Sequence, residues 1–339
     1  MFVDAMAGVE AGPDQIEADA AAAEAAAFDG FGVPETRHDV FTSLTLAARA
    51  TSRITLQSTI AVAFARNPMS MAVLANDLQL ISGGRFQLGL GSQVRQHIER
   101  RFAMPWSHPA ARMEEFIGAV RAIWASWATG GRLRVTGEFY AHTLMTDFFS
   151  PGPNPHGNPP VLLAAVGELM AGVAGRAADG ILCHSFTTEA YLRERTLPAV
   201  RAARGGSLAG FGISLPALVV LGATPRERAA AEAGVRRQIA FYGSTPAYRP
   251  VLDLHGWGDL HERLNKLSRQ GAWEEMGGAI TDDVLDAFAV SGDAAGVAGR
   301  LLQRFGDVVT RMSVYTPYQA DPAEVSAVAG YLRQGCPAS

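Results

Sequence analysis

The chain has 339 residues, enough for one large domain or two ordinary ones, and its 48% hydrophobic and 18% charged residues indicate a globular protein with a sizeable core. A formal net charge of −4 argues against a nucleic-acid-binding protein, which would normally carry a basic face. The first basic residue is Arg37 and no apolar run approaches the ~18 residues of a membrane span, so neither a secretory signal nor a membrane anchor is expected. The two cysteines, Cys183 and Cys336, form no metal-binding pattern, which favours reduced thiols and a cytoplasmic location.

Apolar runs rich in β-branched residues recur along the chain, separated by segments with a helical pattern. Such runs are typical of parallel strands that are buried on both faces. The predicted strands are residues 2–6, 31–34, 53–61, 86–90, 161–165, 180–184, 214–221 and 308–315. The best-defined predicted helices are residues 15–28, 42–50, 69–80, 113–128 and 322–333. For the helix at 69–80, Pro68 fits the first turn and Ser82-Gly83-Gly84 ends the element.

Three segments depart from this alternation of strands and helices. Residues 133–140 alternate around a Thr-Gly turn and predict a surface hairpin. Residues 150–160 are too rich in Pro and Gly for regular structure; an interdomain linker is possible, but the alternation continues after them and favours an ordered loop that leads into the next strand. Residues 241–275 are rich in aromatic, Gly and His residues, and we interpret them as an insertion after the seventh strand.

Eight successive strand–helix units predict an α/β fold, a single (β/α)8 TIM barrel spanning residues 1–339. A doubly wound sheet is the structural alternative, but it would need a Gly-rich dinucleotide turn near its start. The segment Gly89-Leu90-Gly91-Ser92 is a weak match to that turn, because Val94 stands where the third Gly is required. Metal spacing of the H-x-x-x-H kind and a G-x-S-x-G elbow are absent from the sequence, so we expect neither a metal site nor a serine hydrolase.

In a TIM barrel the active site lies at the carboxyl ends of the strands, and this rule selects candidate residues. Glu35 and His38 follow the second strand and are the candidate catalytic pair, since imidazole exchanges protons near neutral pH and a nearby carboxylate can orient it. His184 ends the sixth strand and is a candidate for the substrate pocket, or alternatively a structural hydrogen-bond donor. A helix start at Val166, Gly167 and Glu168 offers free N–H groups to an anion, or is a plain turn.

The central stretch reads as a strand, then Arg66-Asn67-Pro68, then a helix ending in Ser82-Gly83-Gly84-Arg85, then Phe86-Gln87-Leu88-Gly89-Leu90-Gly91. This serial order resembles the bacterial luciferase-like superfamily and, within it, the oxidoreductases that use the deazaflavin coenzyme F420. The resemblance implies hydride transfer between F420 and an unidentified small organic substrate, and a possible homodimer. Two alternatives stay open: an FMN-dependent luciferase-like monooxygenase, and a non-catalytic flavin-binding relative.

The resemblance also implies where the coenzyme binds. A non-prolyl cis peptide is expected at Thr59-Ile60, in a bulge that presses on the coenzyme ring. The residues assigned to the coenzyme in this way are Ser58, Thr59, Ile60, Ala61, Gly91, Ser92, Gln93, Val166, Gly167 and Glu168. Several relatives place a catalytic His in the loop that holds His38, although here Thr36 and Arg37 occupy the usual positions. A related sugar-phosphate dehydrogenase has a Glu where this chain has Ser92-Gln93-Val94, which implies a different substrate.

Overall fold

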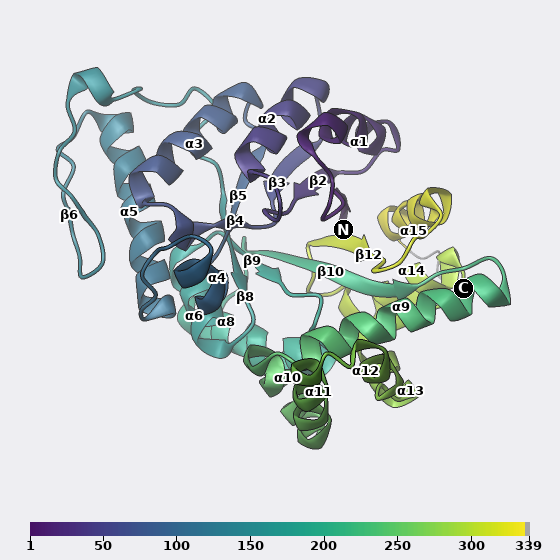
Figure 1. The fold of residues 1–339 in the computed structure, drawn as a ribbon. Helices are drawn as coiled ribbons and strands as arrows, with labels where there is room; N and C mark the ends of the chain where they lie inside the picture. Colours follow the sequence, from purple (N-terminus) through teal and green to yellow (C-terminus); the bar gives the residue numbers. More distant parts are fainter. Residues whose placement is uncertain (336–339) are drawn as a thin grey trace.

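The computed structural model describes residues 1–335 and contains a closed parallel barrel with helices around it (Figure 1). Its strands, in order around the barrel, are β1 (Phe2–Met6), β2 (Gly30–Val33), β3 (Thr55–Ser58), β5 (Phe86–Gly91), β8 (Val161–Ala165), β9 (Gly180–Cys183), β10 (Gly212–Val220) and β12 (Arg311–Tyr315). β12 pairs with β1 and thereby closes the barrel. The predicted TIM-barrel fold is confirmed.

Helices cover the outside of the barrel, and their first turns follow from the sequence. The long outer helices are α1 (Pro13–Ala25), α2 (Val40–Ala50), α3 (Pro68–Ile81), α5 (Pro109–Thr129), α6 (Glu168–Ala177), α8 (Leu197–Ala203), α9 (Pro225–Gly243), α14 (Ala294–Phe305) and α15 (Pro322–Gln334). α3 begins at Pro68, and the Asn67 side chain accepts a hydrogen bond from the Ser70 N–H. α9 begins with a capping box between Thr224 and Glu227. Within residues 1–335, no helix is long and apolar enough to cross a membrane.

The register of the strands determines which side chains face the lumen. Residues opposite one another in a parallel ladder point to the same side. Asp4 lies opposite both Gly30 and Ser313, and Gln57 lies opposite Gln87, so these positions share one face. The alternate positions, such as Val3, Leu56 and Leu88, are buried in the hydrophobic core beneath the helices. The first set therefore lines the lumen.

Polar side chains fill the lumen beneath the carboxyl ends of the strands and form hydrogen bonds with one another. Arg311 donates two hydrogen bonds to Asp4, at 2.5 and 2.7 Å, and the two side chains are 12% and 8% exposed. Gln57 Nε2 donates to Gln87 Oε1 at 2.9 Å. Burial raises the pKa of the Asp4 carboxyl even though the Arg311 guanidinium opposes this effect. The lumen is therefore closed by side chains, as in other TIM barrels.

The structure corrects some predicted boundaries. The third strand, predicted at 53–61, stops at Ser58 and is followed by a separate short strand, β4 (Ala61–Val62), which pairs with β5. The peptide bond Thr59-Ile60 between them is cis, as expected. The sequence prediction missed β11 (Ala289–Ser291), which pairs with the carboxyl end of β10. Three residues directly after a helix carry too little periodicity to be recognised as a strand.

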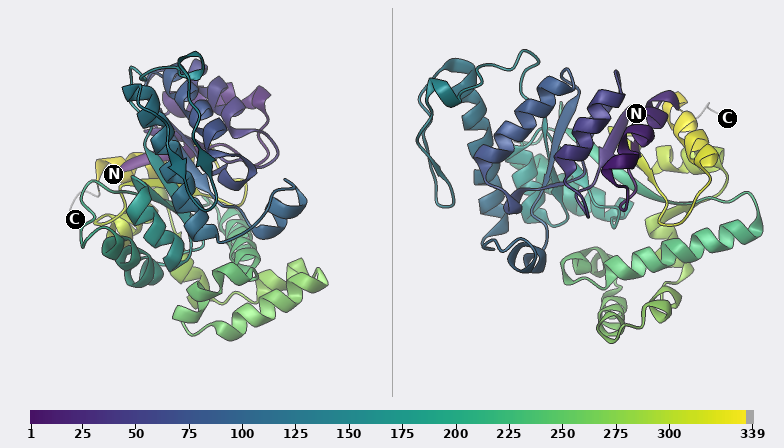
Figure 2. Two further views of the ribbon diagram at one scale, coloured as in Figure 1. Left: turned by 90° about the vertical axis from the view of Figure 1, so that its left-hand side faces the viewer. Right: turned by 45° about the horizontal axis from the view of Figure 1, so that its top comes forward.

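The three irregular segments match their predictions in part. The hairpin consists of β6 (Val135–Thr136) and β7 (Ala141–His142), and residues 150–160 form an irregular loop that leads into β8. Residues 241–275 are mainly helical, from the end of α9 through η4 (Pro246–Tyr248), α10 (Arg249–Leu254) and α11 (Gly258–Gln270) into α12 (Trp273–Gly278). With α13 (Asp282–Phe288), these helices form a layer on one side of the barrel (Figure 1, Figure 2). Cys336 lies outside the described residues.

Candidate active site

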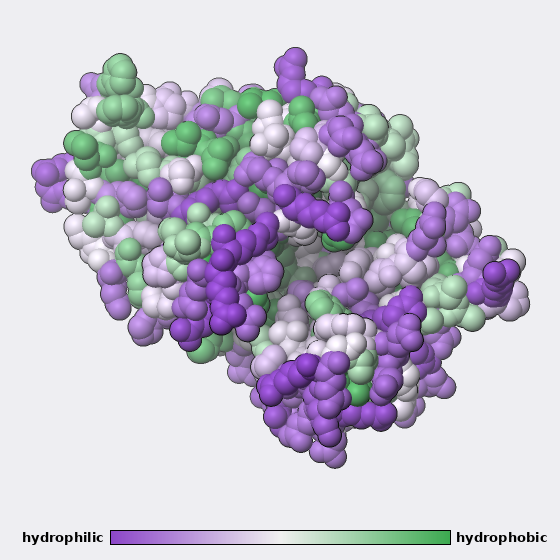
Figure 3. Space-filling view, viewed as in Figure 1, coloured by the Kyte–Doolittle hydropathy of each residue, from purple (hydrophilic) through white to green (hydrophobic). Residues whose placement is uncertain are grey.

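The carboxyl ends of the strands surround a mouth with two unlike sides. Strand order puts β3 across the barrel from β10, so the segments after β2, β3 and β5 face those after β9, β10 and β12. The space-filling view is hollowed near its centre, between α4 (Arg95–Arg100) and α9 (Figure 3). Most of the predicted site residues lie around this mouth, but they fall into separate groups.

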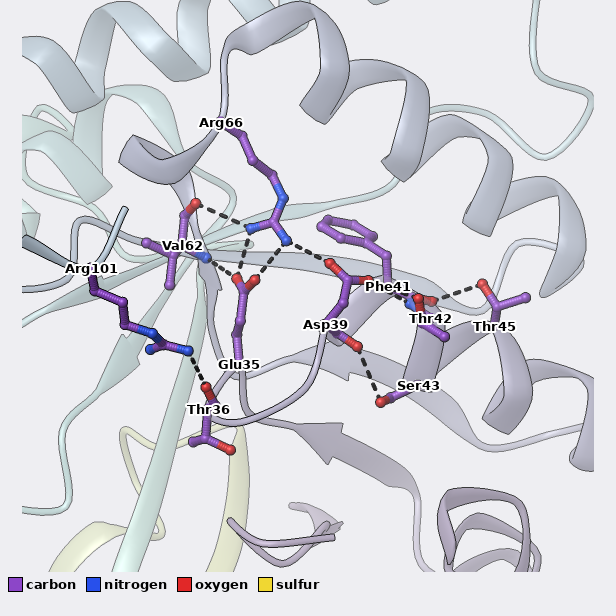
Figure 4. Close-up of polar contacts among 10 residues, drawn as sticks. All are labelled: Glu35, Thr36, Asp39, Phe41, Thr42, Ser43, Thr45, Val62, Arg66 and Arg101. Atoms are coloured by element: carbon purple, nitrogen blue, oxygen red, sulfur yellow. Dashed lines mark hydrogen bonds and ion pairs between the residues drawn. The ribbon is translucent and has the colours of Figure 1, made fainter. Parts of the chain in front are cut away.

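On the first side, Glu35 and Arg66 form a paired-charge unit that we call the Glu35 clamp: Glu35, Asp39, Val62 and Arg66 (Figure 4). Arg66 donates to both oxygens of Glu35, at 2.8 Å from Nη1 and 2.6 Å from Nη2. The Val62 N–H donates to Glu35 Oε2 at 2.6 Å, and Arg66 Nη2 also donates to Asp39 Oδ2 at 2.7 Å. The clamp thus links the loop after β2 to β4 and to the residues before α3.

Burial and charge have opposite effects on the pKa values within the Glu35 clamp. The side chains of Glu35 and Arg66 are only 7% and 16% exposed. Burial alone would lower the pKa of Arg66, but the carboxylates of Glu35 and Asp39 raise it above its usual value. Burial likewise favours a higher pKa for Asp39, but hydrogen bonds from Thr42 and the charge of Arg66 outweigh burial and lower it. Arg66 and Asp39 therefore remain charged. The bidentate pairing of Arg66 with Glu35 is the strong form of such an interaction.

The Glu35 clamp changes the interpretation of the predicted catalytic pair. The expectation that Glu35 orients His38 is wrong, because the Glu35 carboxylate binds Arg66 and the Val62 N–H instead. His38 is exposed beside the start of α1, near Gly12, and makes no hydrogen bond within residues 1–335. The partner of Glu35, Arg66, belongs to the Arg66-x-Pro68 motif noted in the sequence. The sequence alone gives no sign that these two residues, 31 positions apart, form a pair.

The segment between β3 and β4 is held at several points. Ser58 Oγ donates to the Gly89 carbonyl at 2.8 Å and accepts from the Gly89 N–H at 2.9 Å. The Glu35 N–H donates to the Ile60 carbonyl at 3.3 Å, and the Val62 N–H on the other side belongs to the Glu35 clamp. Ser58, Thr59, Ile60 and Ala61 therefore lie at the mouth as a braced unit.

Thr59 and Ile60 differ in what surrounds their side chains. Thr59 Cγ2 lies next to Gly32, on the lumen side, and Thr59 Oγ1 is buried without a hydrogen-bond partner within residues 1–335. The Ile60 side chain packs directly on Gly91, where an added Cβ would lie 2.8 Å from Ile60 carbons. A glycine is therefore needed at position 91 to leave room for the Ile60 side chain. The sequence had instead suggested that Gly91 allows the coenzyme to approach closely.

The turn after β5 satisfies its own polar groups. Gln93 has a left-handed backbone with φ of 59°, and its Oε1 accepts from the Val94 N–H at 3.0 Å. Ser92 Oγ donates to the Gln93 carbonyl at 3.1 Å. Arg95, His97 and Arg100 of α4 follow on an exposed surface.

The start of α6 is open on its outer side. Its N-cap, Gly167, has no side-chain cap, and a Cβ built there would meet nothing within 4 Å. Tyr191 Oη donates to the Val166 carbonyl at 3.4 Å, and Arg195 lies 3.6 Å from Glu168. Within residues 1–335 the N–H groups of this first turn have no side-chain partner, which fits an anion, while Glu168 places a negative charge beside them.

On the second side of the mouth, His184 belongs to a set that we call the rim aromatic group: His184, Phe186, Tyr242 and Tyr248. The His184 ring lies 4.6 Å from the ring of Tyr242, edge-on, and 4.6 Å from that of Tyr248. The Phe186 N–H donates to His184 Nδ1 at 2.9 Å, and His184 Nε2 lies 3.1 Å from Tyr248 Oη. The sequence prediction missed both tyrosines, because they come from α9 and η4, about sixty residues after His184.

A first prediction concerns the Glu35 clamp. Arg66→Met would leave the Glu35 carboxylate buried without its counter-charge, a change that typically costs about 3–5 kcal/mol of folding free energy. Urea denaturation measures this loss. Arg176→Met is the matched control, since its pair with Glu114 at 2.7 Å is largely exposed and should contribute far less. Equal losses in the two variants would contradict the structural role of the clamp.

A second prediction concerns the titration of His184. Burial lowers the pKa of His184 from 6.5 to about 4. The unfolded chain therefore binds this proton more readily, so the stability that neutral His184 contributes is complete above its unfolded pKa and is lost as the pH falls towards 4. Between neutral pH and about pH 4, wild-type protein should lose up to about 3 kcal/mol more than His184→Gln. Denaturation curves across this range measure the difference, and parallel pH dependences would refute it.

Comparisons with known proteins agree with this fold. An uncharacterised protein of Mycobacterium tuberculosis is 51% identical over 306 residues, covering 88% of this chain and 90% of that protein. An F420-dependent glucose-6-phosphate dehydrogenase of Nocardia farcinica is 30% identical over 168 residues, covering 48% of this chain and 47% of that enzyme. The solved coenzyme F420-dependent tetrahydromethanopterin reductase of Methanopyrus kandleri has a TM-score of 0.78 at 20% identity, covering 97% of this chain and 96% of that structure.

The family comparison covers most of the barrel. The luciferase-like monooxygenase family matches residues 1–311, from β1 to the start of β12. The resemblance seen in the sequence, to luciferase-like proteins and to their F420-dependent oxidoreductases, is confirmed. This chain belongs to the luciferase-like monooxygenase family.

Proposed function

We propose that this protein is an F420-dependent oxidoreductase that transfers a hydride between the deazaflavin coenzyme and an organic substrate. The observation that carries the proposal is the Thr59 hydroxyl, which is buried at the mouth without a hydrogen-bond partner within residues 1–335. A buried hydroxyl that lacks a hydrogen bond is costly, so an oxygen or nitrogen of a bound ligand is the natural partner.

The residues around Thr59 fit a flat coenzyme ring. The Ile60 side chain is supported from behind by Gly91, and the Glu35 clamp braces both ends of the segment. In this proposal Ser58–Ala61 and Gly91–Gln93 hold the ring, and the free N–H groups at Val166–Glu168 hold an anionic part of the coenzyme. When bound, F420 supplies the hydride donor or acceptor carbon.

His184 and His38 receive different roles in the proposal. His184, on the opposite side of the mouth, belongs to the substrate pocket. His38 follows β2 at the rim and is free of internal hydrogen bonds within residues 1–335, so it is the proposed proton donor or acceptor. Glu35 has its lone pairs engaged by Arg66 and Val62, and its proposed contribution is to position the loop that carries His38.

The name of the Nocardia farcinica relative supports F420 as the coenzyme. Purified protein titrated with F420 and, separately, with FMN should show saturable absorbance changes with F420 at concentrations where FMN produces none. Thr59→Val, which removes the unpartnered hydroxyl and keeps the shape of the side chain, should weaken F420 binding about fivefold to tenfold, the contribution of one hydrogen bond. Tight FMN binding without F420 binding would support the monooxygenase alternative instead, and binding without turnover of any substrate would support the non-catalytic one.

His38→Ala tests the proposed proton transfer. General acid–base assistance is worth ~10²–10⁴ in rate, so turnover should fall by a factor in that range while F420 affinity stays within a few-fold. His156→Ala, in the exposed loop before β8, is the matched control and should change neither quantity. Steady-state kinetics and coenzyme titration on the same preparations give both numbers. Unchanged turnover in His38→Ala would remove His38 from the mechanism.

A further inference from the structure

The hydrogen bonds around His184 have a defined direction. A backbone N–H can only donate, so the bond from Phe186 requires a lone pair on His184 Nδ1. Burial lowers the pKa of His184 to about 4, and the ring is therefore neutral near pH 7. A neutral ring with a lone pair on Nδ1 carries its hydrogen on Nε2, and this N–H donates to Tyr248 Oη at 3.1 Å.

The Tyr248 hydroxyl therefore accepts a hydrogen bond from His184, and its own hydrogen remains available for donation. Tyr248 Oη uses one lone pair for His184, and no other hydrogen bond of this hydroxyl is formed within residues 1–335. Tyr318 provides a contrast. Its hydroxyl donates to the Val219 carbonyl at 3.1 Å and accepts from the Leu221 N–H at 2.7 Å, so both of its functions are used by the backbone. Only one of these two phenols retains a donor for a ligand.

The surroundings of Tyr248 restrict the kind of ligand. Burial raises the pKa of Tyr248 to about 12, so both His184 and Tyr248 are uncharged near neutral pH. The adjacent Arg249 is exposed and turned to Asp253 and Glu262, at 3.2 and 3.5 Å. The neighbouring rings are those of Phe186 and Tyr242, whose centres lie 5.6 and 5.8 Å from the centre of the Tyr248 ring. An uncharged acceptor oxygen on a flat, unsaturated body suits these neighbours.

We propose that Tyr248 determines substrate specificity by donating its O–H to the carbonyl oxygen of an uncharged aromatic or conjugated substrate, and that His184 is the positioning residue that directs this donor. This inference deepens the proposed function by naming a substrate class. The bond from His184 to Tyr248 also joins β9 to η4, so the helical layer after β10 supplies the recognition group to a site built on the barrel.

Two small probes of nearly equal shape test the proposal. Acetophenone has a carbonyl oxygen next to a phenyl ring, and α-methylstyrene carries a CH₂ group in place of that oxygen. Ligand-observed NMR titration, without any coenzyme, should show acetophenone binding about fivefold to tenfold more tightly to wild-type protein, the contribution of one hydrogen bond. In Tyr248→Phe the ratio of the two affinities should fall to about one.

Tyr318→Phe is the matched control, because it removes a phenol hydroxyl whose bonds are internal, and it should leave the ratio unchanged. A wild-type ratio near one, no saturable binding of acetophenone, or an unchanged ratio in Tyr248→Phe would each overturn the proposal. Should Tyr248→Phe fail to fold, the ¹⁵N resonances of the His184 ring in wild-type protein provide a second test, and a hydrogen on Nδ1 would refute the assigned direction. Because no coenzyme is present, failure here is distinguishable from failure to bind F420.

Discussion

The arrangement of the mouth depends on one buried ion pair. Glu35 lies at the end of β2, where a carboxylate without a counter-charge would be strongly unfavourable. Arg66 satisfies it from the far side of the Thr59–Ala61 segment, and the same guanidinium reaches Asp39, the residue that caps α2. Two strand–helix units, β2–α2 and β3–α3, therefore share one guanidinium (Figure 4). This sharing holds the loop after β2 against β4 and against the residues before α3.

The two sides of the mouth are built on different physical principles. On the β2–β5 side, charge pairs and backbone hydrogen bonds hold a segment in place, and one hydroxyl, that of Thr59, is left over. On the β9–β12 side, ring packing provides the structure, and the phenol hydrogen of Tyr248 has no acceptor within residues 1–335. A coenzyme on one side and a substrate on the other would meet between these two kinds of surface.

The sequence predicted the barrel better than it predicted the site, for a physical reason. A strand buried on both faces carries its signal within its own residues, and the eight barrel strands were recognised in this way. The partner of Glu35 could not be recognised, because an ion pair between residues 35 and 66 leaves no local pattern. The same holds for Tyr242 and Tyr248, which approach His184 only through the course of α9 and η4. Short β11, three residues long, lacked the length that periodicity requires.

The Asp4–Arg311 pair has a consequence for how ligands enter and leave the barrel. Together with Gln57 and Gln87, this pair fills the lumen beneath the mouth, so a ligand cannot pass through the barrel and must leave from the side on which it entered. A molecule bound deeper in the mouth would have to bind first and dissociate last. A large coenzyme lying over Ile60 and a smaller molecule beside Tyr248 would have to pass through the same opening, and the order of their arrival and departure would then be imposed by the architecture of the barrel.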